Sequence, residues 1–338
     1  MTHGACFPPR WRRLQAILLI SSALLATGGA RLAAEGRAEA PAERSLQIFG
    51  LKGPTSIGML PLFGDPPDLG AGYRASVQAV STPDLIVSRL LSGEADFAFL
   101  PVNLAANLYA RGVPIQLAAT TGGGVLYVVT SRSDIHSLRD LAGKTLYGSS
   151  KGSAPEFIMD YLLEKSGVDP VRGLTQVFTY AHSELALALA AGRVDLALLP
   201  EPFVSIALAK NPALKVAIDL QREWGRIEGS GSSYPLTALV VKRKLAAEDR
   251  NAVTRFLAAE RSSMGWVVAH PAEAGALAQR YLDMPGEVVA AAVPRLSLRF
   301  VPAGEARTAV RRFLAVLYSY DPASIGGRMP DERFYLSY

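Results

Sequence analysis

The stretch GEADFAFLP at Gly93–Pro101 returns 99 residues later as GRVDLALLP at Gly192–Pro200. Each copy has a glycine, an aspartate three residues later and a short apolar run that ends in proline. This pattern is typical of a turn from a helix into a buried strand. An apolar helix precedes and follows each copy, and a further strand comes after it. Self-similarity at this period indicates two similar α/β halves.

The segments around the first copy alternate between strand and helix patterns. The predicted strands are Leu46–Leu51, Tyr73–Val80 and Ile115–Thr120. The predicted helices are Leu85–Leu91 and Leu104–Tyr109. Strands separated by helices of this length predict parallel sheets. We therefore expect an α/β fold of two lobes, each a mostly parallel sheet flanked by helices, with a ligand cleft between the lobes.

The composition agrees with two globular lobes. The chain has 338 residues, of which 49% are hydrophobic and 19% charged, which excludes a disordered chain. Cys6 is the sole cysteine, and it excludes a disulfide framework and a Cys-based zinc site. The four histidines are too scattered for a His-rich site. We expect neither a metal nor a cofactor.

The N-terminus has the layout of a secretory signal peptide. Arg10, Arg12 and Arg13 precede the apolar run Leu14–Ala26, and small residues follow at Gly28–Ala30. The apolar run has 13 residues, whereas a membrane-spanning helix needs about 20. We expect export to the periplasm with cleavage near Ala30. An uncleaved membrane anchor is the alternative.

The sequence after the predicted signal is nearly neutral. Without residues 1–30 the chain has 32 basic and 30 acidic side chains, so charge gives no support for a nucleic-acid partner. Residues 31–45 are small, charged and aperiodic, which is typical of a flexible leader. Folded structure is expected from Leu46 onward.

Several phrases carry a resemblance to a known family. They are LLSGEAD at 90–96, VLYVV at 125–129, SLRDLAGK at 137–144, LPEP at 199–202 and IGGRMP at 325–330. The chain resembles the periplasmic solute-binding proteins of ABC importers, in the group that includes nitrate, taurine, alkanesulfonate and thiamine-precursor binders. The resemblance extends from about residue 46 to the end.

The resemblance implies a type II two-lobed binding protein whose lobes are joined by two crossovers. The first is expected at Thr121–Gly124 and the second near Gly229–Tyr234, where glycines absorb changes of φ and ψ. Lobe 1 then combines residues 46–123 and 234–338, and lobe 2 is 124–233. An ordinary strand connection without a hinge role is the alternative at Thr121–Gly124.

The expected function is capture of one small organic or anionic ligand by hinge closure, by a monomer that delivers it to a permease with its ATPase. A sensory ligand-binding module is an alternative. A hydrolase or a thiamine-precursor-type enzyme on the same fold is another. The usual catalytic motifs are absent from the sequence, and so is the cysteine-rich motif of the thiamine-pyrimidine enzymes, so we predict no catalytic residues.

The ligand is expected beyond the carboxyl ends of the strands, where helices begin. The loops Gly53–Ile57 and Ser149–Ala154 combine glycine with hydroxyl residues, and their backbone N–H groups can hold an acceptor without a cationic side chain. The predicted ligand-binding residues are Gly53, Pro54, Thr55, Ser56, Ile57, Thr82, Pro101, Asn103, Thr121, Gly152, Ser153, His182, Glu184, Glu201 and Tyr234.

Each of these predictions has a structural alternative. Ser56 and Ser153 are also good N-caps. His182 can be a surface or capping residue, and Glu201 can stabilise a helix dipole. Tyr234 can belong to the core. The sequence does not identify the ligand.

Overall fold

The two copies of the repeated stretch form equivalent strands in two different sheets. The computed structural model describes residues 43–149, 151–229 and 234–337. In it, β3 (Phe97–Pro101) and β8 (Leu196–Pro200) are interior strands, and the first four residues of each are buried. The predicted signal peptide and the leader up to residue 42 lie outside the described residues. The first strand begins at Arg44, two residues earlier than expected.

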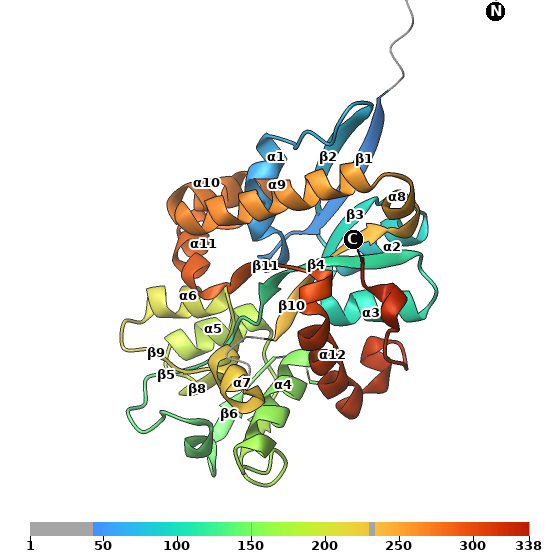
Figure 1. The fold of residues 1–338 in the computed structure, drawn as a ribbon. Helices are drawn as coiled ribbons and strands as arrows, with labels where there is room; N and C mark the ends of the chain where they lie inside the picture. The colour runs from blue at the N-terminus through green and yellow to red at the C-terminus, as the bar shows by residue number, and fades with distance from the viewer. Residues whose placement is uncertain (1–42, 150, 230–233, 338) are drawn as a thin grey trace, which may run out of the picture. The chain divides into compact units, whose positions relative to one another are not determined.

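The first sheet has the order β11-β4-β10-β3-β1-β2 (Figure 1). Its other strands are β1 (Arg44–Leu51), β2 (Tyr73–Val80), β4 (Ile115–Gly123), β10 (Pro235–Lys242) and β11 (Leu298–Pro302). The second sheet has the order β7-β6-β8-β5-β9. Its other strands are β5 (Leu126–Thr130), β6 (Thr145–Tyr147), β7 (Thr175–Val177) and β9 (Lys215–Asp219).

The two orders are equivalent, which confirms the predicted duplication. The run β2-β1-β3-β10-β4 of the first sheet corresponds to β7-β6-β8-β5-β9 of the second. In each sheet the first three of these strands are parallel, as the alternation of strands and helices predicts. The next strand, β10 or β5, is antiparallel to both of its neighbours. Along the chain, the strand that comes before each of these two belongs to the other sheet. The apolar pattern of a strand does not indicate whether it runs parallel or antiparallel to its neighbours.

The repeated aspartate has a similar role in both halves. Gln47 N donates to Asp96 Oδ2 at 3.0 Å, and Arg44 pairs with the same carboxylate at 3.1 Å. In the second copy, Arg132 Nη1 donates to Asp195 Oδ2 at 3.0 Å. Charge-assisted hydrogen bonds of this kind are stronger than neutral ones. Each aspartate therefore ties the start of its strand to a neighbouring segment of the same half.

Helices accompany both sheets. Those around the first sheet are η1 (Pro54–Met59), α1 (Leu60–Gly64), α2 (Pro83–Leu91), α3 (Val102–Ala110), α8 (Arg243–Glu248), α9 (Arg250–Ala269), α10 (Pro271–Leu282), α11 (Gly286–Ala292), η3 (Val293–Arg295), α12 (Ala303–Tyr320), η4 (Pro322–Ile325) and η5 (Glu332–Phe334). Those around the second sheet are η2 (Leu138–Leu141), α4 (Ala154–Lys165), α5 (His182–Ala190), α6 (Phe203–Lys210) and α7 (Leu220–Glu228). None of the helices in the described ranges has the length and apolar character that a membrane crossing requires.

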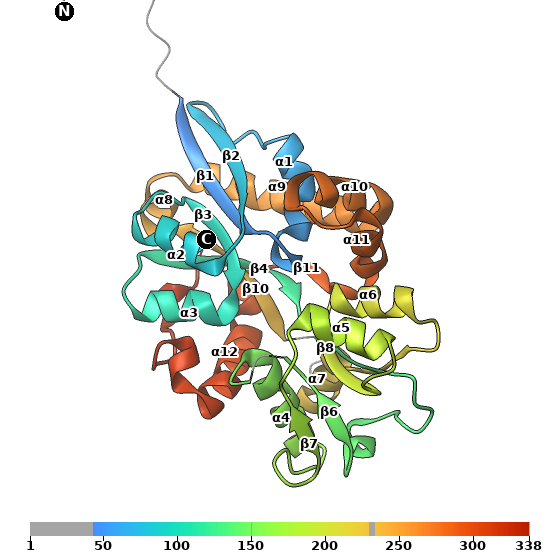
Figure 2. The ribbon, with the colours of Figure 1, turned by 180° about the vertical axis from the view of Figure 1, so that it is seen from behind.

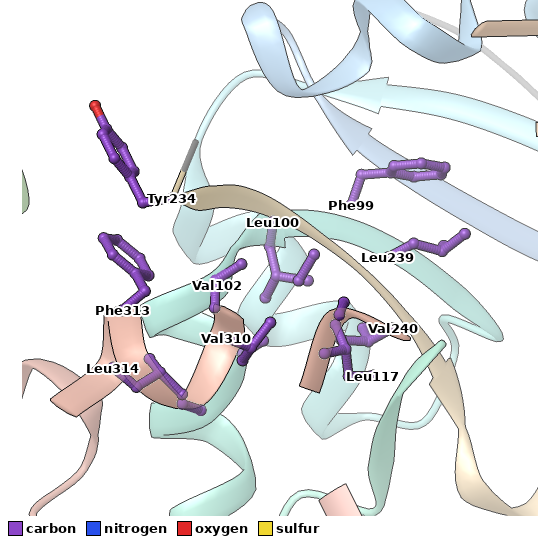
Figure 3. Packing of buried hydrophobic residues seen from close by; sticks show 14 of the residues in the cluster. Phe99, Leu100, Val102, Leu117, Tyr234, Leu239, Val240, Val310, Phe313 and Leu314 are labelled. Atoms are coloured by element: carbon purple, nitrogen blue, oxygen red, sulfur yellow. The ribbon is translucent and has the colours of Figure 1, made fainter. Parts of the chain in front are cut away.

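Two long helices cover opposite faces of the first sheet (Figures 1 and 2). The pleat sends alternate side chains to opposite faces. Phe99 faces α9, where its ring lies 6.3 Å from that of Phe256. Leu117 and Val240 point the other way, toward Val310 of α12 (Figure 3). The loops at the carboxyl ends of the strands are therefore attached to a sheet that is packed on both sides.

Candidate functional site

Four buried hydroxyl groups at strand ends have no hydrogen-bond partner among the described residues. They are Thr55 Oγ1, Ser56 Oγ, Thr121 Oγ1 and Ser149 Oγ. An unsatisfied buried donor costs about 1–3 kcal/mol, so each one needs an explanation. Three of these residues were predicted to bind the ligand, and the fourth begins the predicted loop Ser149–Ala154.

These hydroxyls lie at corresponding ends of the two sheets. Thr55 and Ser56 follow β1, and Thr121 is near the carboxyl end of β4. Ser149 follows β6, which is the counterpart of β1 in the second sheet. Carboxyl ends of strands in open α/β sheets are where ligands bind. A site at these strand ends would thus have unsatisfied donors in both halves.

The loop after β1 has a backbone that only glycine adopts easily. Gly53 has φ +152°, and its carbonyl accepts from Ser56 N at 3.1 Å, which starts the 3-10 helix η1 with Pro54 in its first turn. A Cβ atom on Gly50 would collide with Ser56 Oγ, so this glycine leaves room for the hydroxyl. The helix η1, which carries Thr55 and Ser56, contacts β1, β3 and β4, and Thr121 belongs to the last of these strands.

Ile57, in contrast, is a core residue. Its side chain is fully buried in a cluster with Leu60, Val125 and Val267. The position of Ile57 in the loop predicts a ligand contact, and the burial of its side chain leaves its backbone as the part that can make one. Because Val125 belongs to the crossover between the sheets, this cluster fixes the loop against the crossover.

The remaining predicted residues of the first half lie along the same edge. Pro101 and Asn103 are half-buried where β3 is followed by α3, and β3 contacts η1. Thr82 is exposed at the N-cap of α2, where its side chain makes no capping hydrogen bond. It follows β2, the outermost strand, and so lies at the periphery of the site.

In the second half, the loop after β6 is partly held by its own helix. Gly152 is exposed and its N–H donates to the carboxylate of Glu156 in α4. Ser153 is half-buried at the N-cap of the same helix. The Gly152 N–H is therefore engaged by Glu156, and the hydroxyl of Ser149 is the donor of this loop that has no partner in the described part of the chain.

His182 and Glu184, at the start of α5, have different environments. The His182 ring stacks on Phe203 with the centroids 5.4 Å apart, which links the loops after β7 and β8. Burial lowers the pKa of His182, which favours a neutral imidazole. Glu184 is exposed, and its Oε2 accepts from Ala181 N at 3.1 Å. Its carboxylate caps its own helix instead of reaching a ligand.

Glu201 is also bound by the protein itself. Its carboxylate is 1% exposed and accepts from Ser205 N and Ser205 Oγ, both at 3.1 Å. Arg295 of η3 forms an ion pair with it and donates to Ser205 Oγ at 2.7 Å. The carboxylate of Glu201 is thus engaged by an ion pair and a helix cap, and its contact with a ligand stays a prediction. Sequence reasoning missed Arg295, because no local motif marks it.

A second charged cluster joins α12 to the second half. Arg312 Nε donates to Glu228 Oε2 at 2.5 Å, and Arg312 Nη2 donates to the Tyr161 hydroxyl at 2.7 Å. The guanidinium holds the pKa of the Glu228 carboxyl below its usual range. Sequence analysis assigned the basic side chains of this helix no such contact.

Tyr234 is a core residue at the crossover, not a wall of the cleft. It is fully buried, and its ring stacks on Phe313 at 5.5 Å and meets Trp224 edge-on at 5.3 Å (Figure 3). Its hydroxyl donates to Gln221 Oε1 at 2.8 Å. A ligand contact of Tyr234 stays a prediction, and these aromatic partners from distant parts of the chain argue against one for its side chain.

A groove of about 430 Å³ lies elsewhere, between β4, β11 and α12. Thr120 and Gly122 line it, and the pleat turns them away from the side of Thr121. None of the predicted ligand-binding residues lines this groove. Among the described residues, no three His, Cys, Asp or Glu side chains gather as metal ligands do.

A family model and a curated relative both match this chain to binding proteins. A family model described as the periplasmic substrate-binding protein of a phosphonate ABC transporter matches residues 69–283. YtlA of Bacillus subtilis (strain 168) is 24% identical over 231 residues, and the match covers 66% of each chain, slightly under two thirds of that relative.

Solved structures share the fold over most of their length. An ABC transporter protein from Parabacteroides distasonis has a TM-score of 0.75 and 27% identity, with 86% of this chain and 98% of that chain covered. The periplasmic aliphatic sulphonate binding protein SsuA from Escherichia coli has a TM-score of 0.65 and 17% identity, with 86% and 93% covered. The periplasmic nitrate-binding protein NrtA from Synechocystis PCC 6803 has a TM-score of 0.55 and 10% identity, with 84% of each chain covered.

Proposed function

Since this chain belongs to the family of phosphonate-type periplasmic substrate-binding proteins of ABC transporters, we propose that it captures one small ligand between its two sheets and delivers it to a membrane permease. The observation that carries the proposal is the set of unsatisfied hydroxyls at Thr55, Ser56, Thr121 and Ser149. A ligand placed there would give each donor a partner and would contact both halves at once.

The chemistry of these donors favours a small ligand with several oxygen acceptors. Hydroxyl groups donate to an oxyanion or to a neutral polar group without requiring a cation nearby. Burial lowers the pKa of the half-buried His182, which favours its neutral form and adds no cation to these donors. The names of the family and of its relatives refer to phosphonate, sulphonate and nitrate, and an oxyanion of this class is our proposed ligand.

The mechanism we propose is closure of two lobes on the ligand. Lobe 1 is 46–123 with 234–338, and lobe 2 is 124–233, so the chain crosses between them at Gly124 and again before Tyr234. A ligand that contacts both lobes shifts the equilibrium toward the closed state by its differential affinity for that state. The closed form then docks on the permease and its ATPase.

The remaining expectations are part of the same proposal. The protein acts as a monomer, without catalysis, after export and removal of a signal peptide near Ala30. Hydrolysis is not required of a binding protein, and the relatives are binding proteins. Mass spectrometry of the mature protein from an exporting host would show the cleavage site directly.

A ligand screen tests the proposed site. The full chain without its signal is heated with methylphosphonate, methanesulfonate or nitrate, and the unfolding midpoint is recorded. A ligand at about 100 times its Kd stabilises the folded state by about 2.7 kcal/mol. We expect at least one of these oxyanions to raise the midpoint and to bind with one-to-one stoichiometry in calorimetry.

Matched variants locate the binding. Thr55→Val combined with Thr121→Val removes two of the unsatisfied hydroxyls with little change of shape, and it should abolish the midpoint shift. Thr308→Val, at an exposed position of α12, should leave the shift unchanged. Normal binding by the double variant would contradict the site. Small-angle scattering that shows no compaction with the bound oxyanion would contradict lobe closure.

A further inference from the structure

The carboxyl group of Glu260 is buried in an unusual way. Glu260 lies in α9 and is fully buried, and neither of its carboxyl oxygens has a hydrogen-bond partner among the described residues. Burying a charged or polar group without a partner is costly. No sequence pattern marks this group, and the proposed capture of a ligand assigns it no role.

Glu260 lies directly against the loop that carries two of the site hydroxyls. A Cβ atom on Gly58 of η1 would be 3.2 Å from Glu260 Oε1 and 3.1 Å from Met264 Cε. One helical turn away, Ser263 Oγ donates to Gly58 O at 2.8 Å. Helix α9 therefore holds Gly58 closely, two residues beyond Ser56.

The surroundings of Glu260 favour its neutral form. Burial is the cause that raises the pKa of Glu260 well above its ordinary value. The loop η1 and helix α1 carry no titratable side chain. The charged and titratable side chains on α9 itself and on the other elements that contact it are Arg250, Arg255, Arg261, His270, Arg243, Lys244, Glu248, Glu273, Arg280, Tyr281, Arg295 and Arg299. Within the described part of the chain none of them forms an ion pair or hydrogen bond with Glu260, so burial alone raises its pKa.

We propose that Glu260, as a neutral acid, is a positioning residue for the ligand loop, and that its ionisation displaces η1 and the hydroxyls of Thr55 and Ser56. An ionised carboxylate at this place has to reach water. Because the short helix η1 lies against Glu260, η1 has to move when the carboxylate becomes hydrated. The proposal rests on the proposed function, because it assigns the loop to the ligand. It predicts that ligand capture weakens as pH rises.

Hydrogen exchange of the full chain without its signal tests the proposal without any ligand. Protection of the amides of residues 53–64 is measured from pH 6 to pH 9 and corrected for the intrinsic exchange rate. In the wild type, the opened population should rise by about tenfold per unit of pH between the pKa of the hydrated acid and that of the buried acid. Residues 154–165 of α4 serve as the internal control and should not show this slope.

Variants separate ionisation from packing. Glu260→Gln keeps the shape but cannot ionise, so its loop protection should be independent of pH. Glu305→Gln, at an exposed position of α12, should behave as the wild type does. A pH slope in Glu260→Gln equal to that of the wild type overturns the proposal, and so does full loop protection of the wild type at pH 9. If Glu260→Gln does not fold, the wild type alone decides. A pH slope of exchange that is confined to residues 53–64 supports the proposal. A slope that is absent there, or equal in α4, overturns it.

Titration with methanesulfonate, which remains a monoanion from pH 6 to pH 9, is carried out at these two pH values and distinguishes this proposal from the proposed function. Weaker binding by the wild type at pH 9, with equal binding by Glu260→Gln at both values, supports both. Binding that is independent of pH in the wild type contradicts the role of Glu260 alone. If no oxyanion in the screen binds, the proposed ligand class is contradicted. The role of Glu260 is then decided by hydrogen exchange, which needs no ligand.

Discussion

The guanidinium of Arg295 lies against the carboxylate of Glu201, although 94 positions separate the two residues and they come from segments around different sheets. The side chain of Glu201 is fully buried, whereas 30% of the Arg295 side chain is exposed. The backbone carbonyl of Arg295 also accepts from the Tyr127 hydroxyl at 2.7 Å. This one residue of η3 therefore contacts both β5 and the turn before α6.

Arg295→Gln should destabilise the protein strongly, because it leaves the Glu201 carboxylate buried without its counter-charge. Breaking a buried ion pair costs about 3 kcal/mol or more. Equilibrium unfolding in urea measures the loss. The double variant with Glu201→Gln should recover part of it. Arg299→Gln, at an exposed position of β11, is the matched control and should change the free energy of unfolding little.

The unsatisfied hydroxyls of Thr55 and Thr121 should lower the stability of the free protein, although the proposed ligand needs them for binding. Thr55→Val and Thr121→Val each remove a buried hydroxyl that has no partner in the described residues, so each should stabilise the free protein by about 1 kcal/mol. Thr130→Val should have the opposite effect, because its hydroxyl donates to Asp195 O and accepts from Arg132 N at 3.0 Å. Urea unfolding without ligand compares the three. A loss of stability in both site variants would mean that their hydroxyls are already satisfied.

Gly124→Ala should be disruptive at the crossover. A Cβ atom there would occupy the space of the Tyr234 ring, and Gly124 N donates to Tyr234 O at 3.0 Å. Overpacking of this kind costs about 3 kcal/mol. Gly265→Ala is the control, since Gly265 is an exposed residue of α9 with open space around its Cβ position. It should stabilise the protein by about 0.5–1 kcal/mol. Equal effects of the two substitutions on thermal unfolding would contradict the role of Tyr234.

Asp160 should make the free energy of unfolding fall as pH rises from about 4 to about 6. Burial raises the pKa of Asp160 from 3.8 to about 6, although Gln176 Nε2 donates to its Oδ1 at 2.7 Å. A carboxyl whose pKa is higher in the folded state binds more protons there, so stability decreases as pH rises from about 4 through 6. Asp160→Asn should flatten this part of the profile of unfolding midpoint against pH. Asp65→Asn, at an exposed position, should leave it unchanged.

The duplicated fold could be predicted because its signals are local. A glycine, an aspartate and an apolar run fit within nine residues, and they recur around Asp96 and Asp195. The positions of Thr55, Ser56 and Thr121 at strand ends could be predicted for the same reason, and their contact with a ligand stays a prediction. The rule that ligands bind at strand ends needs only those strand positions. The antiparallel direction of β5 and β10 was missed, because it depends on which sheet the chain enters.

Three predicted ligand-binding residues have partners within the protein that the sequence did not indicate, either from a distant segment or within the same helix. Glu201 meets Arg295, and Tyr234 meets Phe313 and Trp224. Glu184 is used by its own helix. Reading a loop residue as ligand-facing assumes that no other part of the chain occupies its surroundings.

The amino-acid sequence by itself determined the two α/β halves and the strand ends where hydroxyl and glycine residues gather, because turns, caps and apolar periodicity act over a few neighbouring residues. Only the tertiary structure decided which polar groups remain unsatisfied there, and that the carboxyl group of Glu260 is buried against Gly58 without a partner among the described residues. Hydrogen bonding and burial depend on segments that are brought together from opposite ends of the chain, and no short window of sequence contains both partners.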